Sequence, residues 1–237
     1  MKKYLLLLTF LSVIGNAQIV RKYSNEFLNI GAGARGLAMG GAVISNQNDV
    51  YAPMWNPAGL TEVESDWQGA AMHAEYFESI AKYDYISFAK ALDSKDGVLG
   101  ISIVRLGVDN ILNTTQMIDS EGNIDYDKIS KFSTSDYAGI ISYAFRPGGN
   151  QKLSVGINAK IVYRNIGKFA NGFGFGFDAG AIYRADSGYQ FGAMLRDATT
   201  TVNFWSINQK ELSAVVNGEE FNPAPKDKME ITMPKLN

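Results

Sequence analysis

From Trp67 onward, apolar and polar residues alternate along the chain with a period of two. The clearest stretch runs from residue 153 to residue 164, where the odd positions are apolar and the even positions are mostly small or polar. Residues 172–184 repeat this design, with phenylalanine, alanine and tyrosine on one face and mostly glycine on the other. Because successive residues of a strand point to opposite faces, the pattern predicts β-strands with one apolar and one polar face.

Further strands are expected at residues 67–77, 83–92, 97–108, 137–145 and 188–196, which brings the count to about seven. Each is about 9–12 residues long, which is the length that a tilted strand needs to cross a bilayer. Short turns lie near residues 94, 148 and 187, and long polar connections lie between residues 108 and 134 and after residue 197. This layout is typical of outer-membrane barrels, whereas a soluble β-sandwich predicts loops of more even length.

Residues 18–66 lack the alternation and are rich in glycine and alanine. We expect a short helix or tight turn over Ala34–Ala42, since small residues let backbone segments pack closely. A change of chain direction is expected at Asn56, because a residue before proline is disfavoured in the α-helical region. The segment is interpreted as a small N-terminal hatch that packs against the strands of residues 67–237.

The first 17 residues have the features of a secretory signal peptide. Lys2 and Lys3 precede a short apolar run, and Gly15-Asn16-Ala17 supplies small residues of the kind found at a cleavage site. Residues 1–17 are therefore expected to be removed on export, so that the mature chain starts at Gln18. Past this segment no apolar run reaches the length of a transmembrane helix, which is about 20 residues.

Composition and motifs exclude several classes of function. The chain has no cysteine, which excludes disulfides, thiolate metal sites and a lipoprotein anchor, and its formal charge of −2 gives nothing that attracts nucleic acid. Residues 31–36 match Gly-x-Gly-x-x-Gly but lack the βαβ context of a dinucleotide site. The single histidine, His73, lies in a predicted strand without the partners of a catalytic triad. We therefore expect no enzymatic activity and no catalytic, cofactor-binding or metal-binding residues.

The polar faces of the two clearest strands supply the residues that we expect to face a barrel lumen. They are Asn158, Lys160, Arg164, Gly172, Gly174, Gly176, Asp178 and Arg184. The three glycines leave a strip without side chains, which indicates either a wide, ligand-accessible lumen or room for a plug or a bulky side chain. The three cations either form a basic patch or pair with acids such as Asp178.

The polar loop from Asp109 to Ser133 carries four acids close together, namely Asp119, Glu121, Asp125 and Asp127. Carboxylate oxygens suit Ca²⁺, but the spacing matches no EF-hand pattern, so solvated acids are the favoured interpretation. We expect this loop to lie outside the cell and to be mobile or bound to a partner.

The predicted hatch resembles a known family. Residues Gly33-Ala34-Arg35-Gly36-Leu37-Ala38-Met39-Gly40-Gly41-Ala42, followed by Trp55-Asn56-Pro57-Ala58-Gly59-Leu60, resemble the PorV/PorQ family of Bacteroidetes, within the wider group of FadL-like barrels. The Asn-Pro-Ala motif of that group corresponds to Asn56, Pro57 and Ala58, and Gly33, Arg35, Met39, Gly40 and Gly41 complete the hatch motif. The loop of residues 122–133 shares the resemblance, which covers essentially the whole mature chain.

The resemblance implies an all-β, antiparallel transmembrane barrel of about fourteen strands with a small N-terminal hatch, in the outer membrane. It also implies an accessory or shuttle role in type IX secretion. Its partners would be outer-membrane lipid, translocon components and secreted proteins that carry a C-terminal sorting domain. The alternative is a FadL-like channel for hydrophobic small molecules.

The strand count is too small for a closed barrel of this kind. About seven strands leave two open sheet edges, and unpaired backbone groups are costly in lipid. The last residue, Asn237, also differs from the aromatic residue that usually ends an outer-membrane barrel. We therefore expect the chain to form an open half-barrel that belongs to a longer gene product.

Overall fold

The structure, a computed structural model, describes residues 25–92, 97–119, 121–212, 214–216, 219–221 and 228–237. The predicted signal peptide, residues 1–17, lies outside these ranges. Four short helices come first: η1 (Glu26–Asn29), α2 (Ala34–Ala38), α3 (Ala52–Trp55) and η2 (Pro57–Glu62). The strands are β1 (Trp67–Tyr76), β2 (Ala81–Ala91), β3 (Gly97–Asn113), β4 (Ser130–Phe145), β5 (Leu153–Ile166), β6 (Ala170–Arg184), β7 (Gln190–Arg196), β8 (Thr201–Ile207), β9 (Ala214–Val216), β10 (Glu219–Phe221), β11 (Met229–Thr232) and β12 (Lys235–Leu236). Between them lie η3 (Tyr126–Lys128), η4 (Pro147–Gly149) and α4 (Gln209–Leu212).

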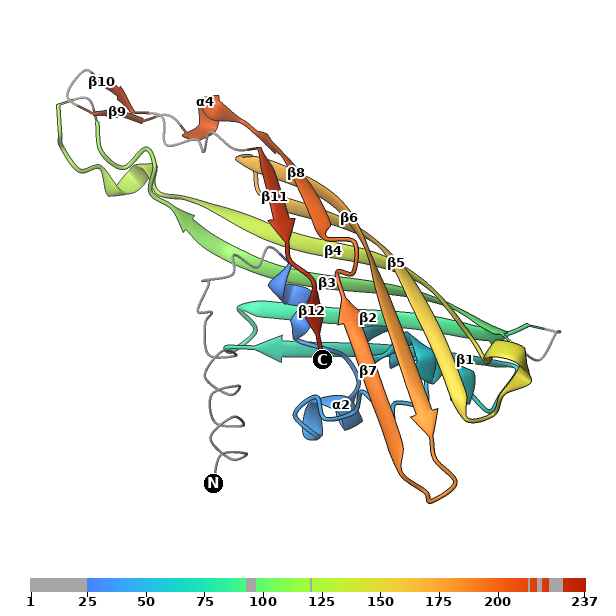
Figure 1. Cartoon of the computed structure of the whole chain (residues 1–237). Coiled ribbons are helices and arrows are strands. Elements are labelled where there is room, and N and C mark those ends of the chain that lie inside the picture. The colour runs from blue at the N-terminus through green and yellow to red at the C-terminus, as the bar shows by residue number, and fades with distance from the viewer. Residues whose placement is uncertain (1–24, 93–96, 120, 213, 217–218, 222–227) are drawn as a thin grey trace, which may run out of the picture.

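Ten of the strands form one antiparallel sheet, in which β1 to β6 each pair with the next strand along the chain (Figure 1). Both β7 and β8 pair with β6: β7 lies along Ala179–Arg184 and β8 lies along Ala170–Phe175. They are therefore two halves of one interrupted strand. β11 and β12 continue the sheet by pairing with β8 and β7. The predicted all-β, antiparallel fold class is confirmed for the described residues.

Two segments that the sequence predicted to be loops contain strands. β3 continues past Val108 to Asn113. The sequence pattern did not show this end of the strand, because a bulge with Asn110 at a φ of +59° shifts the pairing register and breaks the alternation. After Arg196, β8 and β11 extend the sheet. β8 escaped prediction because Trp205 lies on the polar face and Ser206 on the apolar one, which reverses the alternation.

The long connections gather at one rim of the sheet. The β3–β4 connection, residues 114–129, and the chain that leaves β8 lie at the same rim, because β8 ends beside the start of β6. The turns at residues 146–152 and 185–189 lie at the other rim. The rim of the long connections also carries two short turns, at residues 77–80 and 167–169, so the expected division into one rim of short turns and one rim of long connections is found only in part. Among the described residues, no helix combines the length and apolarity that a membrane crossing requires.

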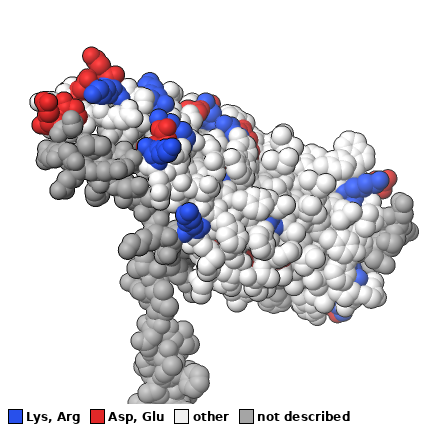
Figure 2. Space-filling model, turned by 90° about the horizontal axis from the view of Figure 1, so that it is seen from above, with Lys and Arg blue, Asp and Glu red and all other residues white. Residues whose placement is uncertain are grey.

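One face of the sheet, which we call the bare face, is apolar and uncovered. Side chains on β5 and β6 such as Ile157, Ile161, Phe173, Phe175 and Phe177 are each 46–55% exposed. Figure 2 shows a broad surface with few charged side chains between its two ends. The apolar faces of these strands therefore point away from the hatch, which packs against the opposite face.

The opposite face, which we call the covered face, packs against residues 25–66. Tyr83 and Tyr85 of β2 are fully buried there beside Phe27 and Trp55. The Tyr85 hydroxyl donates a hydrogen bond to the backbone oxygen of Val50 at 3.0 Å. Burial of these large side chains stabilises the docked segment by roughly 1.5–3 kcal/mol for each one.

Candidate functional site

Asn56 fastens the N-terminal segment to the sheet. Its side chain is fully buried, and its Nδ2 donates hydrogen bonds to the backbone oxygens of Ile44 at 2.9 Å, Ala181 at 3.1 Å and Ala193 at 3.3 Å. Its Oδ1 accepts a hydrogen bond from the backbone N–H of Ala58 at 3.1 Å and so caps η2. One side chain therefore connects the hatch with both β6 and β7.

Glycines on the strands let η2 approach the covered face. A Cβ atom added to Gly180 would collide with Oδ1 of Asn56, and one added to Gly156 would collide with the backbone of Pro57 and Ala58. Gly156 and Gly180 lie opposite each other on β5 and β6. Pro57 and Ala58 therefore pack directly on backbone, as close approach at strand glycines permits.

The glycines of the hatch motif surround aromatic rings of α3 and its neighbourhood. A Cβ atom added to Gly41 would lie 3.1 Å from the ring of Trp55, and one added to Gly33 would lie 2.9 Å from the ring of Tyr51. The indole Nε1 of Trp55 donates to the backbone oxygen of Ala32 at 2.7 Å. Partial burial, and to a lesser extent the charge of Asp49, raises the pKa of the Tyr51 hydroxyl.

The remaining hatch residues lie toward the surface. Arg35 is exposed and donates to the backbone oxygen of Asn46 at 3.1 Å and to Oδ1 of Asn48 at 3.0 Å. Met39 is 43% exposed, and a side chain at Gly40 would meet no atom within 4 Å. These contacts hold the turn after α2 together.

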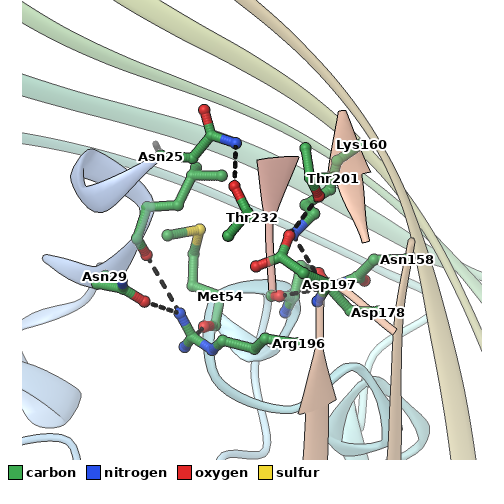
Figure 3. A network of polar contacts seen from close by, with 12 residues as sticks. Asn25, Asn29, Met54, Asn158, Lys160, Asp178, Arg196, Asp197, Thr201 and Thr232 are labelled. Atoms are coloured by element: carbon green, nitrogen blue, oxygen red, sulfur yellow. Dashed lines mark hydrogen bonds and ion pairs between the residues drawn. The ribbon is translucent and has the colours of Figure 1, made fainter. Parts of the chain in front are cut away.

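Lys160 is the centre of a buried ionic network on the covered face (Figure 3). Its Nζ lies 2.7 Å from Oδ1 of Asp178 and 2.7 Å from Oδ1 of Asp197. The Lys160 and Asp178 side chains are 5% exposed and that of Asp197 is 14% exposed. Asn158 Nδ2 donates to Asp178 at 3.1 Å and to the backbone oxygen of Pro53 at 2.9 Å, which links the network to the hatch.

Arg196 and Asp197 join this network to the interruption between β7 and β8. Arg196 donates to the backbone oxygens of Leu28 at 3.3 Å and Met54 at 2.5 Å, so it holds η1 and α3 (Figure 3). The backbone N–H of Asp197 donates to Asp178 at 2.9 Å, and Thr201 donates to the Asp197 carboxylate. The same few side chains therefore fix both the hatch and the break in the strand.

The other two predicted lumen cations are paired as well. Arg164 lies 3.0 Å from Asp136, and Arg184 lies 3.0 Å from Glu62. With Lys160 between two carboxylates, no basic patch forms from these three residues. Of the two interpretations of these cations, ion pairing with acids is the one found. Lys160 pairs with Asp178 as expected, whereas Arg164 and Arg184 pair with other acids.

The glycine strip on β6 is filled by side chains of β8. Gly172 lies opposite Trp205 and Gly174 lies opposite Asn203. A Cβ atom added to Gly176 would collide with Thr201. The space above the glycines therefore holds bulky neighbours and does not widen a lumen.

The chemistry available at this site is structural. The cavity beside Lys160, Asp178 and Arg196 has a volume of about 30 Å³, enough for water and too small for an organic ligand. Among the described residues, no group of three acids or histidines has the geometry to hold a metal ion. What the arrangement can do is hold the N-terminal segment against the sheet.

Sequence reasoning missed Arg196, Asp197 and Trp55 as parts of this site. Arg196 is the last residue of the strand expected at residues 188–196, and Asp197 begins the long connection that was expected after it. The signal that points to Trp55 is the ring of nearby glycines, since closely spaced small residues often accommodate one large side chain.

Comparisons with known proteins leave the geometry as the main guide. No protein-family model matches the chain, and a search of curated proteins finds no match either.

Proposed function

We propose that the chain is part of an outer-membrane β-barrel that acts as a PorV/PorQ-like accessory or shuttle component of type IX protein secretion. The observation that carries the proposal is the sheet with one bare apolar face and one face filled by the Asn-Pro-Ala segment. Lipid would cover the bare face, and the hatch would plug the lumen. FadL-like barrels of about fourteen strands have the even strand number of bacterial outer-membrane proteins.

The filled covered face favours a secretion partner over a channel. A channel for hydrophobic molecules needs a continuous apolar pocket, which would be on the order of 300–1,000 Å³. The cavity under the hatch is about 30 Å³ and is lined by Lys160, Asp178 and Arg196. Translocon components and proteins with sorting domains would then bind at the rim that carries the β3–β4 connection.

Deletion of the intact gene tests this role. We expect proteins with C-terminal sorting domains to accumulate inside the cell, and expression of the wild-type gene to restore their export. Replacing residues 114–129 by a short turn should leave the barrel folded and fail to restore export. Unchanged export of every sorting-domain protein in the deletion strain would remove the proposed role.

The second candidate is a FadL-like channel, and the break between β7 and β8 favours it. Asp197 has a φ of +52° and Thr200 a φ of +66°, so the chain leaves the strand geometry at that point. A movement of the hatch away from this break would open a lateral path. Uptake of a labelled long-chain fatty acid should then rise when the protein is overexpressed, and a flat response counts against transport.

A further inference from the structure

A row of polar side chains crosses the bare face of β1 to β4. His73, Asp84, Arg105 and Tyr137 lie directly opposite one another in successive strands. Asp84 lies 2.6 Å from Nδ1 of His73 and accepts a hydrogen bond from Arg105 at 2.9 Å. Arg105 Nε lies 3.4 Å from the hydroxyl of Tyr137. The row is therefore one connected network with both acidic and basic members.

Apolar side chains lie on one side of this row and charged side chains on the other. Toward the rim of the turns at residues 146–152 and 185–189, Ile86 is 60% exposed and Ile103 is 54% exposed. Toward the opposite rim, the next residues of the same face are Glu75, Lys82 and Gly107, and Lys82 lies 3.0 Å from Asp109. The row therefore lies where an apolar surface ends and charged side chains begin. Charged side chains on the lipid face of a barrel cost least near the membrane interfaces, where lipid headgroups lie, so a headgroup is the part of a lipid that would meet this row.

A groove of about 610 Å³ contains the row and continues along the strands. Ala71, Ile86 and Ile103 form its apolar part, and His73, Asp84 and Arg105 form its polar part. The small side chain of Ala71 on the edge strand leaves space between larger neighbours. The groove therefore matches an amphipathic lipid, because it has an apolar stretch for an acyl chain and a polar end for a headgroup.

The charges at the polar end are of both signs. Arg105 and Tyr137 can donate to a phosphate, whereas Asp84 and the adjacent Glu75, which lies 3.4 Å from His73, can accept from an ammonium group. The acids Glu75, Asp84 and Asp109 offset the cations Lys82 and Arg105, so no excess of positive charge favours a purely anionic headgroup. A headgroup with one phosphate and one primary ammonium complements both kinds of group.

From this complementarity we propose that the groove binds a zwitterionic phospholipid with a phosphoethanolamine headgroup. The phosphate lies at Arg105 and Tyr137, the ammonium at Asp84 and Glu75, and an acyl chain along Ile86 and Ile103. The inference rests on the proposed membrane location and adds a specific lipid site to it.

The experiment uses the intact barrel, expressed from the whole gene and reconstituted into vesicles of phosphatidylethanolamine, phosphatidylglycerol and phosphatidylcholine in equal amounts. After extraction in mild detergent, the lipids that remain bound are measured by mass spectrometry. We expect phosphatidylethanolamine to be enriched over both others. Arg105→Gln and Asp84→Asn should each reduce the enrichment by roughly tenfold, which is the loss of one charge-assisted hydrogen bond. Lys90→Gln, on the bare face of β2 outside the groove, should leave it unchanged.

Asp84→Asn carries a second expectation, because removal of one acid favours an anionic headgroup. Binding of phosphatidylglycerol should therefore increase in this variant and in no other. Equal retention of the three lipids by the wild type, or an enrichment that Arg105→Gln does not change, would overturn the proposal. Flotation of the vesicles separates the two levels: an intact barrel that does not float with them contradicts the membrane location itself.

The absence of cysteine allows a test against a protein occupant. Ile103→Cys places a single thiol in the groove, and Ile161→Cys places one on the bare face outside it. Thiol crosslinking in intact cells should give the same products for both positions if lipid fills the groove. A protein adduct specific to position 103 would identify a protein partner, and the lipid proposal would be wrong.

Discussion

At the scale of single residues, the ionic network on the covered face depends on the buried Lys160. Its ammonium lies between two carboxylates, and the three side chains are at most 14% exposed. A charge removed from water is costly unless a partner compensates it, so the loss of one member leaves the others unbalanced. The ion pair between Lys152 and Asp186, in contrast, lies at the surface, and its side chains are 47% and 82% exposed.

Lys160→Met should therefore destabilise the protein by about 3–5 kcal/mol, because the buried Asp178 and Asp197 then lose the cation that they contact directly. Lys152→Met, the matched control, should cost no more than about 1 kcal/mol. Denaturant unfolding in detergent micelles measures both. Adding Asp197→Asn to Lys160→Met should recover part of the loss, and equal effects of the two single changes would contradict the assignment.

A second prediction concerns Gly180, which lies against Asn56. Gly180→Ala places a methyl group where Oδ1 of Asn56 lies, so we expect a loss of about 1–3 kcal/mol and easier proteolysis of the hatch. Gly139→Ala is the control, since a methyl group there meets no atom within 4 Å. Proteolysis that is equally slow in both variants would show that the hatch does not depend on this contact.

The sequence allows some of these residue roles to be predicted. Lys160 and Asp178 lie on the same face of strands that pair antiparallel, so alternation alone makes an ion pair plausible. Asp197 could not be assigned, because its position depends on a break in the strand that no pattern marks. The glycines at 172–176 are compatible with an open lumen or with a bulky neighbour. The pairing with β8, which the sequence pattern does not mark, decides between the two.

At the scale of elements, the break between β7 and β8 stores backbone strain. Thr200 has a φ of +66°, a region that β-branched residues rarely adopt, which costs on the order of 1–3 kcal/mol. Thr200→Gly should relieve this strain and stabilise the protein by about 1 kcal/mol. Thr199→Gly should instead destabilise it slightly, as glycine usually does. Thermal unfolding of the two variants distinguishes them, and a loss at position 200 would contradict the strain.

The β3–β4 connection is organised by a carboxylate. Asp119 accepts hydrogen bonds from the backbone N–H groups of Glu121 and Asn123, both at 2.9 Å. The hydrogen bond from the Asn123 backbone is the main reason that the pKa of Asp119 lies below its ordinary value. Because the pKa of Asp119 is lowered, the ionised carboxylate stabilises the turn when the pH is above the ordinary pKa of an aspartate. The turn loses this stabilisation as the pH falls through the lowered pKa of Asp119.

Hydrogen exchange of the Asn123 amide should therefore become faster, after correction for its intrinsic rate, as the pH falls below about 4. Asp119→Asn keeps an acceptor oxygen and removes the titration, so its corrected exchange rate should not depend on pH in this range. A wild-type profile that is flat over the same range would show that the carboxylate does not organise the turn.

Secondary structure follows the sequence where alternation is regular, as in β5 and β6. The secondary structure differs from the sequence pattern where a single residue changes the strand register or the face on which side chains lie. The bulge at Asn110 moves the following residues to the other face, so the end of β3 reads as loop. In β8 the indole of Trp205 occupies the polar face because the glycines of β6 leave space for it, a fact that depends on pairing between distant segments.

At the scale of the whole molecule, two faces of different character define the fold. The covered face is filled by the hatch, and the bare face exposes isoleucine and phenylalanine over several neighbouring strands. Soluble proteins rarely leave so broad an apolar surface open to water. Alternation predicts this division directly, whereas the docking of the hatch depends on tertiary contacts of Asn56 and Arg196.

The final prediction tests which solvent meets the bare face. Phe175 is 48% exposed on β6 amid other apolar side chains, and Tyr126 is 70% exposed on η3 in the β3–β4 connection. If lipid surrounds the strands, Phe175→Arg should destabilise the protein by about 2–4 kcal/mol in vesicles, as charges do on the lipid face of barrels near the midplane. Tyr126→Arg should change stability by less than about 0.5 kcal/mol, since it lies on the surface away from packed contacts. Urea titration of both variants in vesicles gives the comparison. If the two arginines are tolerated equally, water and not lipid covers the bare face, and the barrel proposal gives way to a soluble β-sheet protein.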